Sequence, residues 1–143
     1  MKRIMLTVLA LALPAVVFAI DANRLTYVQL LAPSASQSQT STAVDIQAYK
    51  GNAAFIVVFE GSALSSTGTV TLTHCTTSGG TYLTATNLAG TVCAVSQVGP
   101  STNDLTSIPI DLARLDRYVK VTVTQSGITN KVAALLAVPM TSN

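Results

Sequence analysis

The stretch Asp116–Thr124, which reads DRYVKVTVT, decides the fold class of this chain. Val119, Val121 and Val123 occupy every second position in it, and polar or aromatic side chains occupy the positions between them. Successive side chains of a β-strand point to opposite faces, so a period of two is typical of a strand with one buried and one solvated face. The stretch therefore predicts a half-buried strand.

Similar short segments, separated by turn signals such as Ser78-Gly79-Gly80, fill most of the chain on either side. The further strands that we expect are Ala43–Ala48, Ala53–Phe59, Thr69–Cys75, Thr81–Thr84, Gly90–Ser96, Leu105–Leu112 and Lys131–Val138. The segment Ala53–Phe59 is apolar throughout, which is typical of a strand covered on both faces, and Lys131–Val138 is expected to be largely buried. About eight short strands predict an all-β domain, either an antiparallel β-sandwich or a jelly-roll, preceded by an N-terminal arm or short helix.

Three segments divide the chain: an apolar leader (1–19), an arm and polar linker (20–41), and the β-sandwich body (42–143). In the leader, Lys2 and Arg3 precede the apolar run Ile4–Leu13, and Val17-Phe18-Ala19 has the form of a signal-peptidase site. Two interpretations are open. The leader is a secretory signal removed after Ala19, or it is retained and buried between subunits.

The arm carries Leu25, Val28 and Leu31 at intervals of three residues. This spacing suits a short helix capped by Asp21, and an extended arm inserted into a neighbouring subunit is the alternative. The polar run Ser34–Ser41 then links the arm to the body.

The composition is poor in charge. Charged residues make up 10% of the chain, against a usual fraction of about 25%, while hydrophobic residues make up 49%. Because a soluble monomer normally carries more surface charge, we expect neighbouring subunits to cover much of the surface. Lys2 and Arg3 account for the whole net charge of +2, and the other basic residues form no stripe, which argues against nucleic-acid binding.

No motif predicts an enzyme, a cofactor or a metal site. His74 is the only histidine, and its place in an alternating segment predicts a half-buried strand residue rather than a catalytic base. His74 and Cys75 are neighbours on that strand and point to opposite faces, so they do not readily share a metal ion. Cys75 and Cys93 are expected to be buried thiols in a cytosolic protein, or one cross-strand disulfide in an exported one.

A charged cluster stands out in this charge-poor chain, formed by Asp111, Arg114, Asp116, Arg117 and Lys120. One interpretation is a solvated loop that leads into a strand. The other is an intersubunit contact, in which an arginine guanidinium of the cluster binds a carboxylate in a bidentate manner.

Several segments together resemble small structural proteins of tailed phages, of the head-decoration (cement) or minor-capsid kind. The similar stretches are Val28–Pro33 (VQLLAP), Thr42–Tyr49 (TAVDIQAY), Ala53–Phe59, Gly68–His74 (GTVTLTH) and Asp116–Thr124 followed by Ser126-Gly127. The resemblance extends from Leu25 to Val138. The turn Thr76–Thr81 is less acidic than in that family, and the family does not require an apolar leader.

This resemblance implies a β-sandwich that binds the outer face of a capsid shell and reinforces it. The implied partners are the major capsid protein and copies of the chain itself, in a trimer or another cyclic homo-oligomer on the virion exterior, with no membrane and no nucleic acid. The alternative is an exported bacterial surface or filament subunit with a cleaved signal peptide. A sugar-binding module or a hydrolase on the same fold is disfavoured, since aromatic residues make up 5% of the chain and tryptophan is absent.

Overall fold

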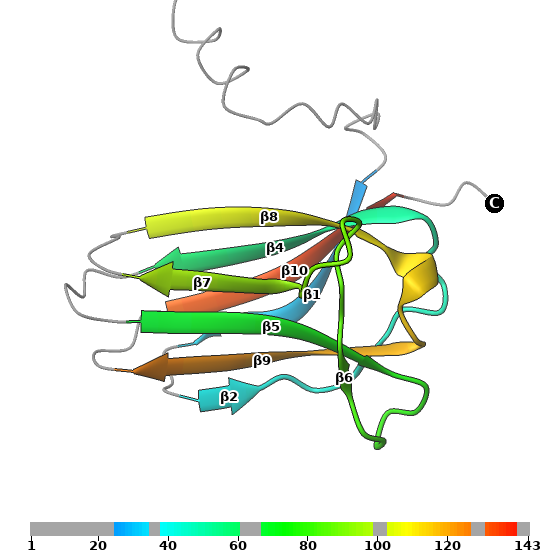
Figure 1. Cartoon of the computed structure of the whole chain (residues 1–143), viewed down its shortest axis with the longest axis horizontal. Coiled ribbons are helices and arrows are strands. Elements are labelled where there is room, and N and C mark those ends of the chain that lie inside the picture. The colour runs from blue at the N-terminus through cyan, green and yellow to red at the C-terminus, as the bar shows by residue number, and fades with distance from the viewer. Residues whose placement is uncertain (1–24, 35–37, 61–66, 99–102, 127–130, 140–143) are drawn as a thin grey trace, which may run out of the picture.

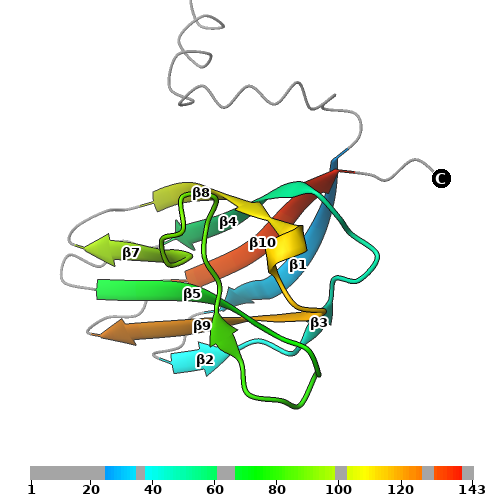
Figure 2. The same cartoon turned by 45° about the vertical axis from the view of Figure 1, so that its right-hand side comes forward.

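The computed structural model describes residues 25–34, 38–60, 67–98, 103–126 and 131–139, which form two antiparallel β-sheets packed face to face (Figures 1 and 2). The predicted leader and the predicted cap Asp21 lie outside these residues. Within them, no helix is long and apolar enough to cross a lipid bilayer.

The first sheet has four strands in the order β1-β10-β4-β8. These are β1 (Leu25–Ser34), β10 (Lys131–Pro139), β4 (Asn52–Glu60) and β8 (Asn103–Asp111). The second sheet has the order β2-β9-β5-β6, with β3 beside β9 and β7 beside β5. Its strands are β2 (Ser38–Thr40), β3 (Val44–Asp45), β5 (Thr67–Cys75), β6 (Leu83–Thr84), β7 (Ala94–Val98) and β9 (Tyr118–Ser126), and a short 3-10 helix, η2 (Leu112–Arg114), joins β8 to β9.

The strand pairings are nested along the chain. The outermost pair is β1 with β10, followed inward by β2 with β9, β4 with β8, and β5 with β7. Successive pairs alternate between the two sheets. A long antiparallel ribbon wrapped in this way is a jelly-roll, so the prediction of an antiparallel sandwich or jelly-roll is confirmed.

The core lies between the two sheets. The largest fully buried side chains come from both, and they include Phe55 and Phe59 of β4 and Leu72 of β5. The alternation predicted in Asp116–Thr124 is also confirmed, since Val119, Val121 and Val123 are all 0% exposed. Burial of each such side chain contributes about 1.5–3 kcal/mol relative to leaving it in water.

The helix proposed for Leu25–Leu31 is wrong, because these residues form the edge strand β1. The pairing of β1 with β10 shifts between Gln29 and Leu31, so Leu30 and Leu31 are both buried. Such a β-bulge breaks the period of two, and here it produced the spacing of three residues that resembles a helix. The extended alternative holds in part: the segment is extended, but it pairs with β10 of its own chain.

Two further segments differ in extent from the expected strands. The strand expected at Ala43–Ala48 is limited to β3, because the chain turns after Ile46 and the Tyr49 N–H donates to the Ile46 carbonyl at 2.9 Å. The polar linker contributes β2, which pairs with β9 through Ser38–Thr40. Residues 25–40 therefore supply one strand to each sheet of the body.

Candidate functional site

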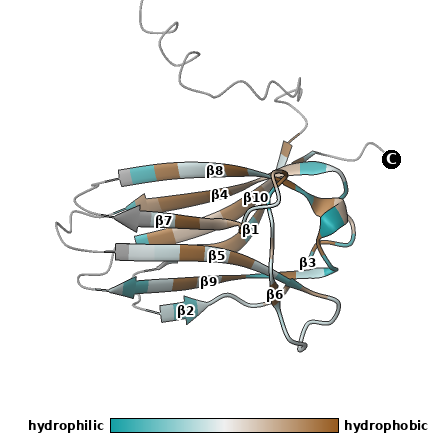
Figure 3. Ribbon diagram, in the orientation of Figure 1, coloured by the Kyte–Doolittle hydropathy of each residue, from teal (hydrophilic) through white to brown (hydrophobic). Residues whose placement is uncertain are grey.

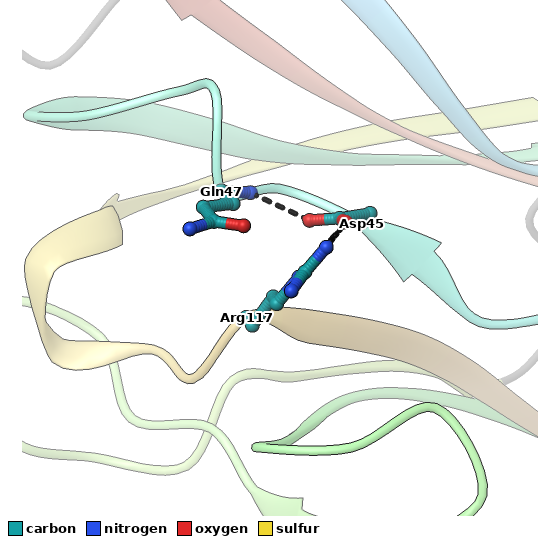
Figure 4. Close-up of polar contacts among 3 residues, drawn as sticks. All are labelled: Asp45, Gln47 and Arg117. Carbon is teal, nitrogen blue, oxygen red and sulfur yellow. Dashed lines mark hydrogen bonds and ion pairs between the residues drawn. The ribbon is translucent and has the colours of Figure 1, made fainter.

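Arg117 of the charged cluster forms a close ion pair with Asp45, which lies outside the cluster in the sequence (Figure 4). One carboxylate oxygen of Asp45 accepts from Arg117 Nε at 2.9 Å and Nη2 at 2.7 Å, and the other accepts from the backbone N–H of Gln47 at 2.9 Å. The Arg117 hydrogen bonds, and then the Gln47 N–H, hold the pKa of Asp45 below its usual value. The hydrogen bonds to Asp45 also raise the pKa of Arg117. This contact ties β3 to the start of β9.

The other residues of the cluster also contact their own chain. Lys120 Nζ lies 4.3 Å from the centre of the Tyr82 ring, a cation–π contact, and Asp116 binds His74. Arg114 Nε is 3.9 Å from the carboxylate of Asp111, and its side chain is 53% exposed. The residues predicted for an intersubunit contact, Arg114, Asp116, Arg117 and Lys120, thus have intramolecular partners, and among the ion pairs the separation is longest for Arg114.

His74 closes one end of the sandwich. Its Nδ1 atom is 3.1 Å from the backbone N–H of Asp116 and 3.0 Å from the Asp116 carboxylate. These contacts are alternatives, since Nδ1 accepts from the N–H when unprotonated and donates to the carboxylate when protonated. Within the described part of the chain, no group of three or more His, Cys, Asp or Glu side chains is placed to hold a metal ion.

Cys75 and Cys93 are both buried free thiols. Cys93 belongs to the core between the sheets, and burial raises its pKa to about 11. Cys75 follows Thr71 and Thr73 on the opposite face of β5, where it pairs with Tyr118. The two side chains therefore point to opposite faces of the second sheet, and a disulfide between them would require the backbone to move.

The outer face of the first sheet is apolar. Residues that face away from the core form three cross-strand rows, which we call the apolar face. From β1 to β8 these rows are Tyr27–Ala137–Ala54–Pro109, Gln29–Leu135–Ile56–Ser107, and Ala133–Val58–Leu105. Tyr27 is 64% exposed and Leu105 is 66% exposed. Figure 3 shows the hydrophobic colour along β4 and β10.

Polar groups on the apolar face are few and peripheral. Gln29 and Ser107 lie on the two edge strands, at opposite ends of the middle row. The rows beyond the apolar face carry charge at both ends: Lys131 and Glu60, 3.9 Å apart, at one end, and Asp111, which pairs with Asn52 and is 3.9 Å from Arg114, at the other. The three rows between these charges present aliphatic and aromatic carbon.

The outer face of the second sheet carries hydroxyl groups instead. We call it the hydroxyl face, and its rows are Ser38–Thr124–Thr69–Ser96, Thr40–Thr122–Thr71–Ala94, and Lys120–Thr73–Thr84. Neighbouring hydroxyls contact one another, as Thr69 Oγ1 and Ser96 Oγ do at 3.3 Å. Each hydroxyl can also donate to and accept from water, so this face needs no covering partner.

No protein-family model and no curated protein sequence matches the chain. Among solved structures, a chain in the cryo-EM atomic structure of Broad Bean Stain Virus is similar to it, with a TM-score of 0.44 and 10% sequence identity. The match covers 84% of this chain and 85% of that chain. A similarity of this size does not place the two chains in one family.

Proposed function

We propose that this chain is a non-enzymatic structural protein of a virion, a decoration (cement) protein that binds the shell of a capsid and stabilises it through subunit contacts. The observation that carries the proposal is the apolar face. It has no charged side chain within its three rows, and the charged residues Lys131, Glu60 and Asp111 flank it at its two ends.

The strands β4 and β10 are apolar on both of their faces. On β4, Phe55, Val57 and Phe59 fill the core, while Ile56 and Val58 between them point outward and remain partly exposed. The sequence of β4 is that of a strand covered twice, and the described residues cover it once. Removal of apolar surface from water contributes about 25 cal/mol per Å², so covering the second face by another subunit stabilises an assembly.

The two faces support an orientation for the bound protein. The apolar face would contact subunits, either the major capsid protein or further copies of this chain, and the hydroxyl face would contact water. The stretches that resemble phage decoration proteins support the same assignment, since they lie in β1, β4, β5 and β9, the strands that build both faces.

Electron microscopy of particles isolated with the native chain tests the proposal. An antibody raised against the whole chain, coupled to gold, is expected to label the outside of icosahedral heads. Label along filaments or on cell envelopes, with unlabelled heads, would contradict a decoration role. N-terminal sequencing of the same material adds a second test, because a chain that begins at Ile20 was exported.

The leader favours one alternative, an exported surface or filament subunit whose signal peptide is cleaved after Ala19. That alternative predicts a Cys75–Cys93 disulfide, whereas a decoration protein assembled in the cytosol retains two thiols. Thiols should be counted after unfolding in denaturant, because the raised pKa of Cys93, about 11, makes it slow to react in the folded chain. Two thiols per chain are expected, and none would favour export.

A further inference from the structure

We infer that the apolar face binds the same face of a second copy of this chain, about a two-fold axis that runs parallel to the strands between β10 and β4. The inference rests on the proposed function and deepens it, since it names one partner and the surface that receives it. It follows from the strand order of the first sheet and from where the polar groups lie on it.

The strand order β1-β10-β4-β8 places two strands on each side of that axis. A half-turn about the axis lays β1 of one copy over β8 of the other, and β10 over β4, while every position along the strands is kept. Each cross-strand row therefore lies over the same row of the second copy. The strands of the stacked sheets remain roughly aligned, as in the common face-to-face packing of twisted sheets about 10 Å apart.

This arrangement pairs the two polar side chains of the apolar face with each other. Gln29 on β1 lies over Ser107 on β8 of the second copy, and the reverse contact repeats it. An amide and a hydroxyl can exchange hydrogen bonds, so neither is left unsatisfied when water is excluded.

The ion pair at one end of the face is matched in the same way, while at the other end Asp111 of β8 lies over Leu25 of the second copy, beyond the three apolar rows. Lys131 on β10 lies over Glu60 on β4 of the second copy, and Glu60 lies over the second Lys131. The four charges then alternate in sign around the axis. Both side chains are well exposed, at 60% and 64%, so this contact sets the register of the two copies more than it adds affinity.

The middle row supplies most of the apolar contact. Leu135 of one copy lies over Ile56 of the other, and the next row sets the smaller Ala137 over Ala54. At the edges, the exposed ring of Tyr27 lies over Pro109.

The size of the face predicts a weak dimer. Four strands about 4.8 Å apart and three rows about 6.8 Å apart give a footprint of roughly 400 Å² per copy. Stable complexes bury about 800 Å² per partner. The contact should therefore be sparse between free chains in dilute solution and populated where neighbouring copies are held close together, as on a shell.

Cysteine cross-linking in the full-length chain tests this geometry. The variant Q29C/S107C places its new thiols on β1 and β8, three strand spacings or about 14 Å apart, too far for a short bis-maleimide to join within one chain. In the two-fold arrangement each lies over the other's position in the second copy, across sheets about 10 Å apart, a separation that this reagent spans and a disulfide does not. Treatment of concentrated protein with the reagent should yield a covalent dimer on a denaturing gel, at least about tenfold more than either single variant yields.

The matched control is S38C/S96C, which places thiols on edge strands of the second sheet at the same three-strand separation across the hydroxyl face. The single variants also control for Cys75 and Cys93. The two-fold contact would be overturned if the single variants or the hydroxyl-face pair gave as much dimer as Q29C/S107C, or if no variant gave any dimer. Gold labelling of heads is a separate measurement. Labelled heads with no trapped dimer would reject this contact and leave the proposed function standing. Trapped dimer with unlabelled heads would support the contact and reject the proposed function.

Discussion

The apolar face and the hydroxyl face are built on similar backbones and differ in one chemical respect. On β4 and β10 the outward positions hold Ile56, Val58 and Leu135, while on β5 and β9 they hold threonines such as Thr71 and Thr122. Valine, isoleucine and threonine all suit a strand, because branching at Cβ fits the pleated surface. Strand formation therefore does not account for the difference between the faces, and the proposed function accounts for it by assigning the apolar face to subunit contacts.

The two sheets also differ in how side chains tie them to the rest of the chain. The second sheet is bound at one end by Arg117–Asp45, residues 72 positions apart, and by Asp116–His74, 42 positions apart. On the first sheet, the described residues show the exposed pair Lys131–Glu60 and the local pair Asp111–Arg114, each at 3.9 Å. Among the described residues, none forms a layer over the outward side of the first sheet.

The largest effect should come from one pair of neighbouring residues on β4. Phe55 is 0% exposed in the core, and Ile56 beside it lies on the apolar face. We expect Phe55→Ala to lower the free energy of unfolding by about 3–5 kcal/mol and Ile56→Ala by less than about 1 kcal/mol. Urea denaturation at a concentration where the chain is monomeric measures both.

A loss for Ile56→Ala as large as that for Phe55→Ala would mean that the apolar face is already covered within one chain. The outward side of β4 would then be a second core, and the apolar face would not be open to a partner. Dilution separates a covering subunit from a covering segment, since only the former is lost as the protein concentration falls.

The next effect concerns association rather than folding. Ile56→Lys puts a charge at the centre of the apolar face, and a two-fold contact would bury two such charges. We expect self-association to weaken by about 100-fold or more, because burial of an unpaired charge is costly. Thr122→Lys, central on the hydroxyl face, is the matched control and should leave association unchanged. Sedimentation velocity over a concentration series compares the two, and equal losses would show that neither face is selective.

The strands of the body could be predicted from the sequence because alternation is a local signal. Alternation in β5 and β9, and continuous apolar runs in β4 and β10, locate these strands to within two residues. β1 was predicted less well, since its bulge buries Leu30 and Leu31 together and disturbs the period. β2 could not be predicted at all, because its polar residues are extended only through their pairing with β9.

The candidate site was harder to predict, because it depends on contacts between distant segments. The sequence marked Arg117 as able to bind a carboxylate, but nothing in it identified Asp45 as the partner. The apolar face did leave a signal, namely that Ala53–Phe59 is apolar at every position. That pattern predicts a strand covered on both faces, and the described residues supply one of the two covers.

The smallest expected effect concerns the Asp45–Arg117 contact at one end of the second sheet, whose contribution to stability should depend on pH. Asp45 has a folded-state pKa below its usual value of 3.8, because it accepts hydrogen bonds from Arg117 and from the Gln47 N–H. A lowered pKa stabilises the fold at pH values above 3.8, and this contribution is lost as the pH falls through the folded-state pKa. Asp45→Asn should therefore lower the urea midpoint slightly at pH 7 and not at all at pH values below the folded-state pKa. Both side chains are exposed, so the difference will be small and reduced by salt.

Arg117→Gln should reproduce the loss at pH 7, and the double variant should add little to either single change, because each removes the same contact. A midpoint difference that persists unchanged in acid would instead assign the effect of Asp45→Asn to a contact that does not depend on its charge. The end of the second sheet would then be held by backbone pairing of β3 with β9 rather than by the ion pair.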